Sequence, residues 1–325
     1  MGLGALAGVV ALPHPAAAQA VRFSLPLACR GGLTCVVQNY VDTDPGPGTR
    51  DYRCGGQTYD GHNGVDIRIP DMAAERRGVA VLAAASGTVL RLRNTAPDVS
   101  IRAADAPSVV GQECGNGLVI DHGEGWETQY CHLAQGSLVV KPGQRVERGA
   151  ILGQVGLSGM TEFPHLHLTV RHNGKVVDPF GPNLAPGRCN STAIGNLWDP
   201  ETAQALAYRA GTVLNAGFSS GTVTMDEVEQ ATPPRPDLKG AFLVGYVRAI
   251  HLMAGDVQVL TITGPKGDMV AQAKLPPLDH DKAQTLVYAG LRRPAMGWTI
   301  GVYDGRYQVF RGGREVVSKA FATRL

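Results

Sequence analysis

The sequence contains few charged residues, and their signs nearly cancel. Asp, Glu, Lys and Arg make up 18% of the 325 residues, and 30 basic residues against 28 acidic ones give a formal net charge of +2. This balance excludes a strong electrostatic attraction to nucleic acid or to an anionic membrane surface. No nucleic-acid partner is therefore expected.

Two signatures of zinc proteins are missing. The chain has no Cys-x-x-Cys pair and no His-Glu-x-x-His segment, which other zinc proteases carry on a helix. The six cysteines are widely spaced, which favours disulfides in an exported protein over a zinc finger. Six cysteines can pair in fifteen ways, and the sequence does not choose among them. Our working hypothesis is the set Cys29–Cys35, Cys114–Cys131 and Cys54–Cys189.

Long apolar runs are also lacking. Pro13 and Pro15 interrupt the apolar N-terminus well before the roughly 20 apolar residues that a membrane span needs. The small residues that follow end in Ala18-Gln19-Ala20, which has the form of a signal-peptidase site. We expect residues 1–20 to be a signal peptide, with an N-terminal membrane anchor as the alternative, and no membrane span after processing. Export and disulfides together favour the periplasm of a Gram-negative bacterium, with secretion as the alternative.

What the sequence does contain is turn-forming residues and short alternating stretches. With 42 glycines and 21 prolines, the chain is typical of a mainly β protein. Asp199-Pro200 opens a short helix, and strands with regular turn signals follow it, as in an immunoglobulin-like β-sandwich. The predicted organisation is a first domain over 21–185 with a surface insertion at about 94–117, a linker and short helix over 186–211, and a C-terminal sandwich over 212–325.

Histidines and one carboxylate recur on the polar faces of short strands. Asp66 stands between Val65 and Ile67, so it points away from the apolar face of that strand. By the same alternation, His165 and His167 share one face of a second strand. The same rule puts His132 on the face of Tyr130 and Thr128. Each of these residues alone would be ordinary. Three of them together would make a tetrahedral zinc site whose fourth position is left for water.

These residues resemble a known family. His62-x-x-x-Asp66, Tyr130-Cys131-His132-Leu133 and His165-Leu166-His167 match, in order and spacing, the signature of the lysostaphin-type (LytM-like) zinc peptidases of bacterial cell walls. The resemblance covers about residues 60–182. It implies an antiparallel β-sheet peptidase domain, the duplicated hybrid motif fold. It also implies one zinc ion bound by His62, Asp66 and His167, with His132 and His165 as catalytic residues.

The resemblance implies an exported zinc endopeptidase that hydrolyses peptide bonds in peptidoglycan stem peptides or cross-links. Peptidoglycan is then the expected partner. The alternative is a catalytically silent or occluded member that binds the wall and regulates another hydrolase, and a disulfide-stabilised adhesion protein is a third interpretation. The C-terminal domain is expected to pack, to target the wall or to bind a protein partner. The remaining histidines that we considered, namely His122, His172, His251 and His280, are expected to be exposed.

Overall fold

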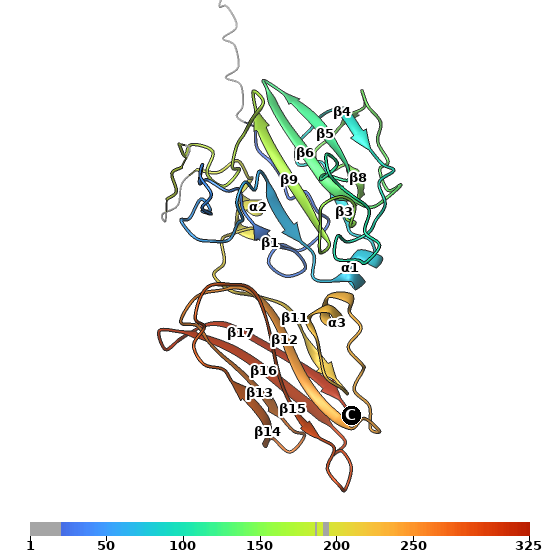
Figure 1. Ribbon diagram of the computed structural model, residues 1–325, viewed down its shortest axis with the longest axis vertical. Helices are drawn as coiled ribbons and strands as arrows, with labels where there is room; N and C mark the ends of the chain where they lie inside the picture. The colour runs from blue at the N-terminus through green and yellow to red at the C-terminus, as the bar shows by residue number, and fades with distance from the viewer. Residues whose placement is uncertain (1–20, 186, 191–194) are drawn as a thin grey trace, which may run out of the picture.

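The computed structural model describes residues 21–185, 187–190 and 195–325. The predicted signal peptide, residues 1–20, lies outside the described residues. Two β units are stacked end to end along the longest axis of the molecule (Figure 1). No helix within the described ranges is both long enough and apolar enough to cross a membrane.

An eight-stranded antiparallel sheet forms the first unit. Its order is β1-β2-β9-β6-β5-β4-β7, and β10 pairs with β9. The strands are β1 (Val36–Asn39), β2 (Val65–Arg68), β4 (Gly87–Arg93), β5 (Asn116–Gly123), β6 (Trp126–Leu133), β7 (Arg145–Val146), β9 (His165–His172) and β10 (Lys175–Val176). Strands β3 (Ala80–Leu82) and β8 (Ile151–Gln154) form a separate two-stranded ribbon.

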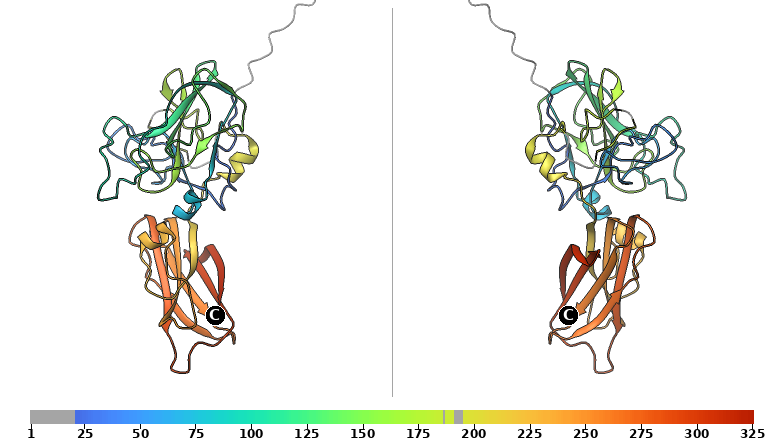
Figure 2. Two further views of the ribbon diagram at one scale, coloured as in Figure 1. Left: turned by 90° about the vertical axis from the view of Figure 1, so that its right-hand side faces the viewer. Right: turned by 90° about the vertical axis from the view of Figure 1, so that its left-hand side faces the viewer.

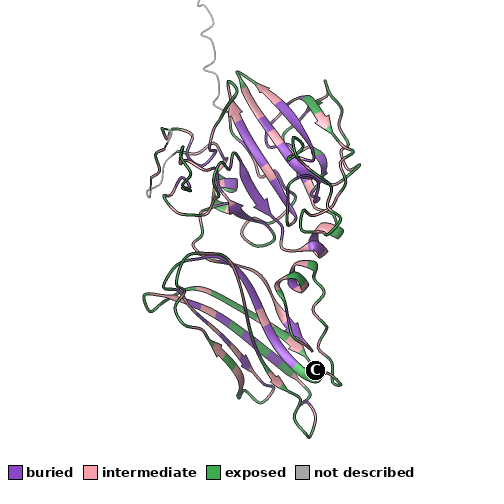
Figure 3. Cartoon of the chain, viewed as in Figure 1, coloured by how far each residue is buried: buried purple, intermediate pink, exposed green. Residues whose placement is uncertain are grey.

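Strands β2 and β9 are neighbours in this sheet and alternate as the sequence predicts. Val65 and Ile67 on β2, and Leu166 and Leu168 on β9, are fully buried in the core. Figure 3 shows these buried stretches running through both strands. The opposite face of the same strands is therefore polar, and it is the face that carries the candidate site.

The N-terminal segment is part of this unit. Residues 36–39 form the edge strand β1, which pairs with β2. Phe23, Leu27 and Tyr40 are buried in the same core as β2 and β9. The segment Arg22–Cys54, which the family signature does not include, thus supports the sheet directly.

All six cysteines are paired as hypothesised. The disulfides are Cys29–Cys35, Cys54–Cys189 and Cys114–Cys131. The last one ties the end of the predicted insertion to strand β6. Between residues 94 and 115 the insertion contains no helix or strand, as the sequence indicated.

The second unit consists of two sheets around one core. Strands β11 (Thr212–Ser219), β12 (Phe242–Leu252) and β15 (Lys282–Arg292) form one sheet. Strands β14 (Met269–Lys274), β13 (Val257–Thr263), β16 (Val302–Arg311) and β17 (Arg314–Arg324) form the other, in that order. Trp298, Tyr303 and Tyr307 are buried between the sheets, so these aromatic residues pack the core.

Lettered A to G in chain order, the strands of this unit form the sheets A-B-E and D-C-F-G. Constant-type immunoglobulin domains instead place the fourth strand beside the fifth, in sheets A-B-E-D and C-F-G. The unit is therefore a seven-stranded sandwich in which the fourth strand has joined the second sheet.

Three short helices complete the chain. They are α1 (Met72–Arg76), α2 (Pro200–Ala205) and α3 (Met225–Gln230). Helix α2 begins where predicted, with the Asp199 side chain accepting a hydrogen bond from Thr202 N. Helices α1 and α3 lie where the two units meet (Figures 1 and 2).

Candidate metal centre

The register of two strands brings the first two candidate ligands together. Asp66 on β2 lies directly opposite His167 on β9, and both point to the polar face. His62 reaches the same point from the loop before β2. Gly64 allows this close approach, because a Cβ atom there would lie 2.5 Å from His167 Nε2 and 2.8 Å from the Leu168 carbonyl oxygen. A side chain at position 64 would displace the His167 ring.

Three ligand atoms converge at this point. His62 Nε2 lies 3.2 Å from Asp66 Oδ1 and 3.2 Å from His167 Nδ1, and His167 Nδ1 lies 2.9 Å from Asp66 Oδ1. A tetrahedral zinc ion with ligands at about 2.0–2.2 Å separates its ligand atoms by about 3.3–3.6 Å. The triangle is therefore close to the face of such a tetrahedron.

Hydrogen bonds on the far side of each ring fix which nitrogen carries the proton. His62 Nδ1 donates to the Tyr40 carbonyl at 2.6 Å, which leaves a lone pair on Nε2. His167 Nε2 lies 3.1 Å from Thr169 Oγ1 and 3.2 Å from Asn63 Oδ1, both of which can accept, and a proton on Nε2 leaves the lone pair on Nδ1. When both imidazoles are neutral in these tautomers, two lone pairs and the Asp66 carboxylate face one another. Such a donor set fits a divalent metal.

The ionisation of the ligands favours the same conclusion. Burial would raise the pKa of the Asp66 carboxyl, but the adjacent imidazoles of His165 and His62 hold it well below its usual range. Burial lowers the pKa of His167. Burial also acts to lower the pKa of His62, but the Asp66 carboxylate and the Tyr40 carbonyl outweigh it, and the net shift is upward. Asp66 is thus ionised, and protonation of His62 is the step that competes with metal.

The two predicted catalytic histidines lie beside this triangle. The His132 and His165 rings are 4.7 Å apart, and both side chains are buried. His132 Nδ1 donates to the Ser158 carbonyl at 2.8 Å and His165 Nδ1 to the Phe163 carbonyl at 2.9 Å, so each keeps a lone pair on Nε2. Burial, together with the neighbouring imidazoles, holds the pKa of His132 well below its usual range. His132 is therefore a neutral proton acceptor.

The predicted facing of His132 was wrong. Tyr130 and Thr128 point into the core, where the Tyr130 hydroxyl bonds Ala84 N and Thr128 Oγ1. His132 has a φ of 65°, in the left-handed region, which breaks the strand alternation and turns its ring to the polar face with Cys131. Side chains alternate strictly only in a regular strand. No feature of the sequence predicts the left-handed backbone at His132.

Residues 60–179 match the family model described as Peptidase family M23. We refer to this part of the chain as the M23 domain because of this match. Over 123 residues it is 31% identical to the peptidoglycan DD-endopeptidase ShyA of Vibrio cholerae serotype O1, covering 38% of this chain and 23% of that protein. It is 32% identical over 124 residues to the cell division protein DipM of Caulobacter vibrioides, covering 36% and 17%. The chain thus spans about a quarter or less of these relatives.

Solved structures also resemble the M23 domain. The catalytic domain of lysostaphin from Staphylococcus simulans is 24% identical, with a TM-score of 0.28, over 43% of this chain and 85% of that one. A zinc-containing peptidase from Vibrio cholerae is 26% identical, with a TM-score of 0.29, over 44% and 39%.

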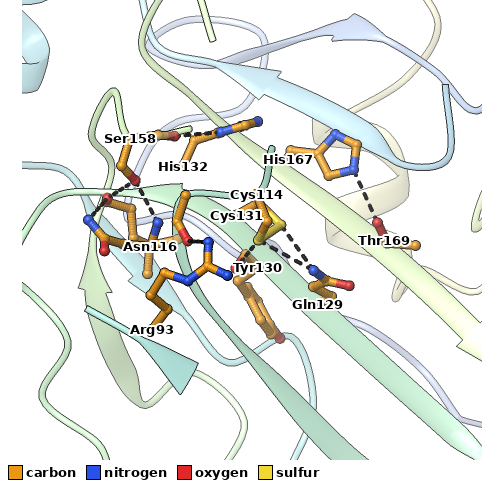
Figure 4. The surroundings of a disulfide bond; sticks show 12 residues. Arg93, Cys114, Asn116, Gln129, Tyr130, Cys131, His132, Ser158, His167 and Thr169 are labelled. Atoms are coloured by element: carbon orange, nitrogen blue, oxygen red, sulfur yellow. Dashed lines mark hydrogen bonds between the residues drawn. A yellow bond between two sulfur atoms is a disulfide. The ribbon is translucent and has the colours of Figure 1, made fainter. Parts of the chain in front are cut away.

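A pocket of about 400 Å³ opens beside the metal ligands of the M23 domain. The loop Tyr59–Asn63 forms one rim, and Glu113 and Cys114 of the insertion form another. Figure 4 shows how the Cys114–Cys131 disulfide holds the end of the insertion next to His132 and His167. The insertion therefore borders the pocket and does not fill it.

Several further residues, which were not predicted from the sequence, support the M23 site. Asn39 Nδ2 donates to Asp66 Oδ2 at 2.8 Å, and the Tyr40 carbonyl orients His62. Both belong to strand β1 or its end, outside the family signature. The half-exposed Tyr59 ring lies 4.4 Å from the His62 ring, at the pocket rim. No motif marks these positions. The contact of Asn39 depends on strand pairing, and the contact of Tyr40 uses a backbone atom.

The other four histidines of the described residues lie away from the metal ligands, and of these four His280 alone is exposed as predicted. His122 lies in β5 and is half-buried, with contacts to the Ser86 carbonyl and Thr128 Oγ1. His172 is half-buried and stacks on Trp126 at 4.2 Å. His251 is buried and donates to the Gln38 carbonyl at 2.7 Å. Alternation predicts on which face of a strand a side chain lies, but it does not predict whether another part of the chain covers that face.

Proposed function

We propose that this chain is an exported zinc endopeptidase that hydrolyses peptide bonds in peptidoglycan stem peptides or cross-links. The observation that carries the proposal is the convergence of three ligand atoms, from His62, Asp66 and His167, next to two further buried histidines in an M23 domain. The relatives' names supply the substrate class. The expected location in a Gram-negative periplasm favours a cross-link that contains meso-diaminopimelate.

The residues of this chain divide the work. When zinc is bound, it supplies a Lewis acid and lowers the pKa of a water molecule to about 7. His132, neutral and with its Nε2 lone pair turned to the site, accepts the proton of the attacking water. His165 Nε2 lies 3.3 Å from Asp66 Oδ1, so the ring faces the site. In its imidazolium form, with a proton on each nitrogen, it would donate from Nε2 to the developing oxyanion or to the leaving amine.

The proposal extends to the fold of the second unit. The strand arrangement supports an immunoglobulin-like sandwich for residues 212–325, with its fourth strand moved to the second sheet. The alternative, a silent wall-binding regulator, is disfavoured by the open pocket and by the presence of all five site residues.

Three single variants and a metal assay test the proposal. Asp66→Ala is expected to abolish both zinc binding and the release of soluble peptides from purified sacculi. His132→Ala is expected to keep zinc but to lower kcat by about 10²–10⁴-fold, because the proton acceptor is lost. Asp304→Ala removes an exposed carboxylate from β16, away from both cavities, and serves as the matched control, with unchanged activity. Sacculus binding without release by the wild-type zinc protein would instead support the regulator.

A further inference from the structure

The polar face of the sheet continues beyond the metal site into a second cavity. A cleft of about 850 Å³ lies between the two units. Arg68, opposite His165 in the β2–β9 pair, lines this cleft and stacks over the Phe163 ring at 4.2 Å. The Phe163 ring in turn lies 4.8 Å from the His165 ring. The cleft therefore begins one side chain away from the catalytic histidines.

The first pocket and this cleft lie in line. Along β9, Arg171 borders the pocket at one end, His167 holds the metal position, and His165 adjoins the cleft at the other. The distance from Arg171 to His165 along a strand is roughly 20 Å. An extended peptide of about six residues laid on this face would cross the metal position and enter the cleft.

Buried contacts fix the walls of the cleft. Glu229 on α3 bonds both Arg68 of the first unit and Arg248 of the second, and both guanidinium groups are buried. Arg248 also donates to the Pro70 carbonyl at 2.5 Å, and Asn215 Nδ2 donates to Asp71 Oδ2 at 2.8 Å. Polar contacts of this kind hold only one relative orientation of the two units. The cleft is thus preformed and not a gap between loosely tethered domains.

The exposed side chains of the cleft carry both signs of charge. Arg102 and Glu162 form an ion pair at 2.6 Å on the wall of the first unit. Asp226 and Lys282 line the wall of the second unit. Asp226 has no ion-pair partner among the described residues, and Lys282 contacts only the exposed Asp279 and His280. A purely anionic or purely cationic ligand would meet repulsion here, whereas a ligand with adjacent ammonium and carboxylate groups would not.

We propose that the interdomain cleft is a substrate subsite that binds a zwitterionic peptide segment, with its ammonium group at Asp226 and its carboxylate at Lys282. The inference rests on the proposed function and names what the C-terminal unit contributes to it. A diamino acid in a stem peptide carries both groups, so the cleft would select cross-links that contain such a residue. The C-terminal unit then forms part of the active-site groove.

Binding of an uncleavable probe tests this inference. The probe is the tetrapeptide L-Ala-γ-D-Glu-meso-diaminopimelate-D-Ala, which lacks a cross-link, and calorimetry with the full chain gives its Kd. The double variant Asp226→Asn/Lys282→Gln is expected to raise Kd about tenfold, since it removes both charged contacts. The matched control Asp304→Asn/Lys319→Gln makes the same changes on exposed positions of β16 and β17 and should leave Kd unchanged. Thermal unfolding verifies that both variants fold.

A second probe examines the charges on the ligand. Acetylation of the diaminopimelate amine and amidation of its carboxylate should weaken binding to the wild type about tenfold and to the double variant hardly at all. Equal affinity of the wild type and the double variant for the charged probe, or no binding to the wild type, would overturn the subsite. Cleft-dependent binding without sacculus hydrolysis would contradict the proposed function alone. Equal rates of sacculus hydrolysis by the wild type and the double variant would contradict the subsite alone.

Discussion

At the scale of single residues, the metal centre depends on groups that do not touch the metal position. The Tyr40 carbonyl selects the tautomer of His62, and Asn39 holds the second oxygen of the Asp66 carboxylate. Such partners keep the ligand lone pairs aimed at one point. We therefore expect metal affinity to depend partly on strand β1, which lies outside the M23 match.

Removal of the Asn39 amide should weaken metal binding while the fold stays intact. For Asn39→Ala we expect zinc affinity to fall about 10- to 100-fold, because the Asp66 carboxylate loses the partner that orients it. Competition with a fluorescent chelator measures this. The control Gln272→Ala removes an exposed amide from β14. Equal zinc affinity in Asn39→Ala and wild type would show that Asn39 has no role in the site.

The sequence predicted the principal site residues but not their supports. His62, Asp66 and His167 were found because the motif spacing and the strand alternation both point to them. His132 was identified from the family resemblance but placed on the wrong face, since its left-handed backbone breaks the alternation. Asn39 could not be found, because its contact with Asp66 depends on the pairing of β1 with β2. Pairing between distant segments leaves no local pattern.

At the scale of elements, the short helix α3 joins the two units through one carboxylate. Glu229 accepts hydrogen bonds from Arg68 and Arg248, whose guanidinium groups are buried. Burial lowers the pKa of Arg68 to about 10, and the positive charge of Arg248 adds to this effect while Glu229 opposes it. Without the carboxylate, two buried cations would face each other.

Glu229→Gln should therefore destabilise the protein strongly. We expect the free energy of unfolding to fall by about 3–5 kcal/mol, the usual cost of leaving buried charge uncompensated. Urea denaturation followed by tryptophan fluorescence provides the measurement. Glu201→Gln makes the same change at an exposed position on α2 and should have almost no effect. Equal midpoints for Glu229→Gln and wild type would contradict the bridging role.

The Cys114–Cys131 disulfide should stabilise the insertion at the pocket rim. A closed loop of this length contributes about 3 kcal/mol. We expect Cys114→Ser/Cys131→Ser to lose about that much stability, to expose residues 94–113 to faster hydrogen exchange, and to lower activity. Cys29→Ser/Cys35→Ser opens a shorter loop on another part of the sheet, so it should cost about 2 kcal/mol and leave activity unchanged. Equal hydrogen exchange over 94–113 in both variants would argue against this anchoring.

Strand faces were easier to predict than strand partners. The alternation of β2 and β9 gave the correct buried and polar faces, and Asp199-Pro200 marked the start of α2. The role of residues 36–39 as an edge strand was not predicted, because four residues carry too little pattern. The place of β14 in the second unit depends on which sheet it pairs with, and that is decided by tertiary packing.

At the scale of the whole molecule, a buried carboxyl group should shape the pH dependence of stability. Asp178 is buried, and one of its oxygens has no hydrogen-bond partner among the described residues. Burial raises its pKa to about 7. In the unfolded chain its pKa is about 4, so the folded state holds an extra proton between these values. The free energy of unfolding should therefore fall as pH rises from about 4 to 7.

Asp178→Asn should remove this decrease in the free energy of unfolding between pH 4 and 7. In metal-free protein we expect the variant to match the wild type near pH 4 and to be more stable by about 2–4 kcal/mol at pH 8, since an amide carries no charge to bury. Calorimetric unfolding across this pH range measures the difference. Asp304→Asn, an exposed control, should follow the wild type. A parallel pH dependence of wild type and Asp178→Asn would contradict the account.

The arrangement of the two units is the part that the sequence did not predict. Their contacts are isolated polar residues, such as Gln38 with His251 and Asp71 with Asn215, which produce no periodic signal. The C-terminal unit was expected to pack, to target the wall or to bind a partner. It packs against the first unit, at one end of the polar face that carries the candidate metal centre.

The central claim, hydrolysis of peptidoglycan peptides by a metal-activated water, is tested most directly by mass spectrometry of muropeptides. Sacculi are digested in H₂¹⁸O with residues 21–325, with and without chelator, beside Asp66→Ala. We expect new peptide termini that carry one ¹⁸O atom in the carboxyl group, and we expect them to vanish with chelator and in the variant. Labelled products that persist in Asp66→Ala or in chelator, or no products from zinc-loaded protein, would contradict the account.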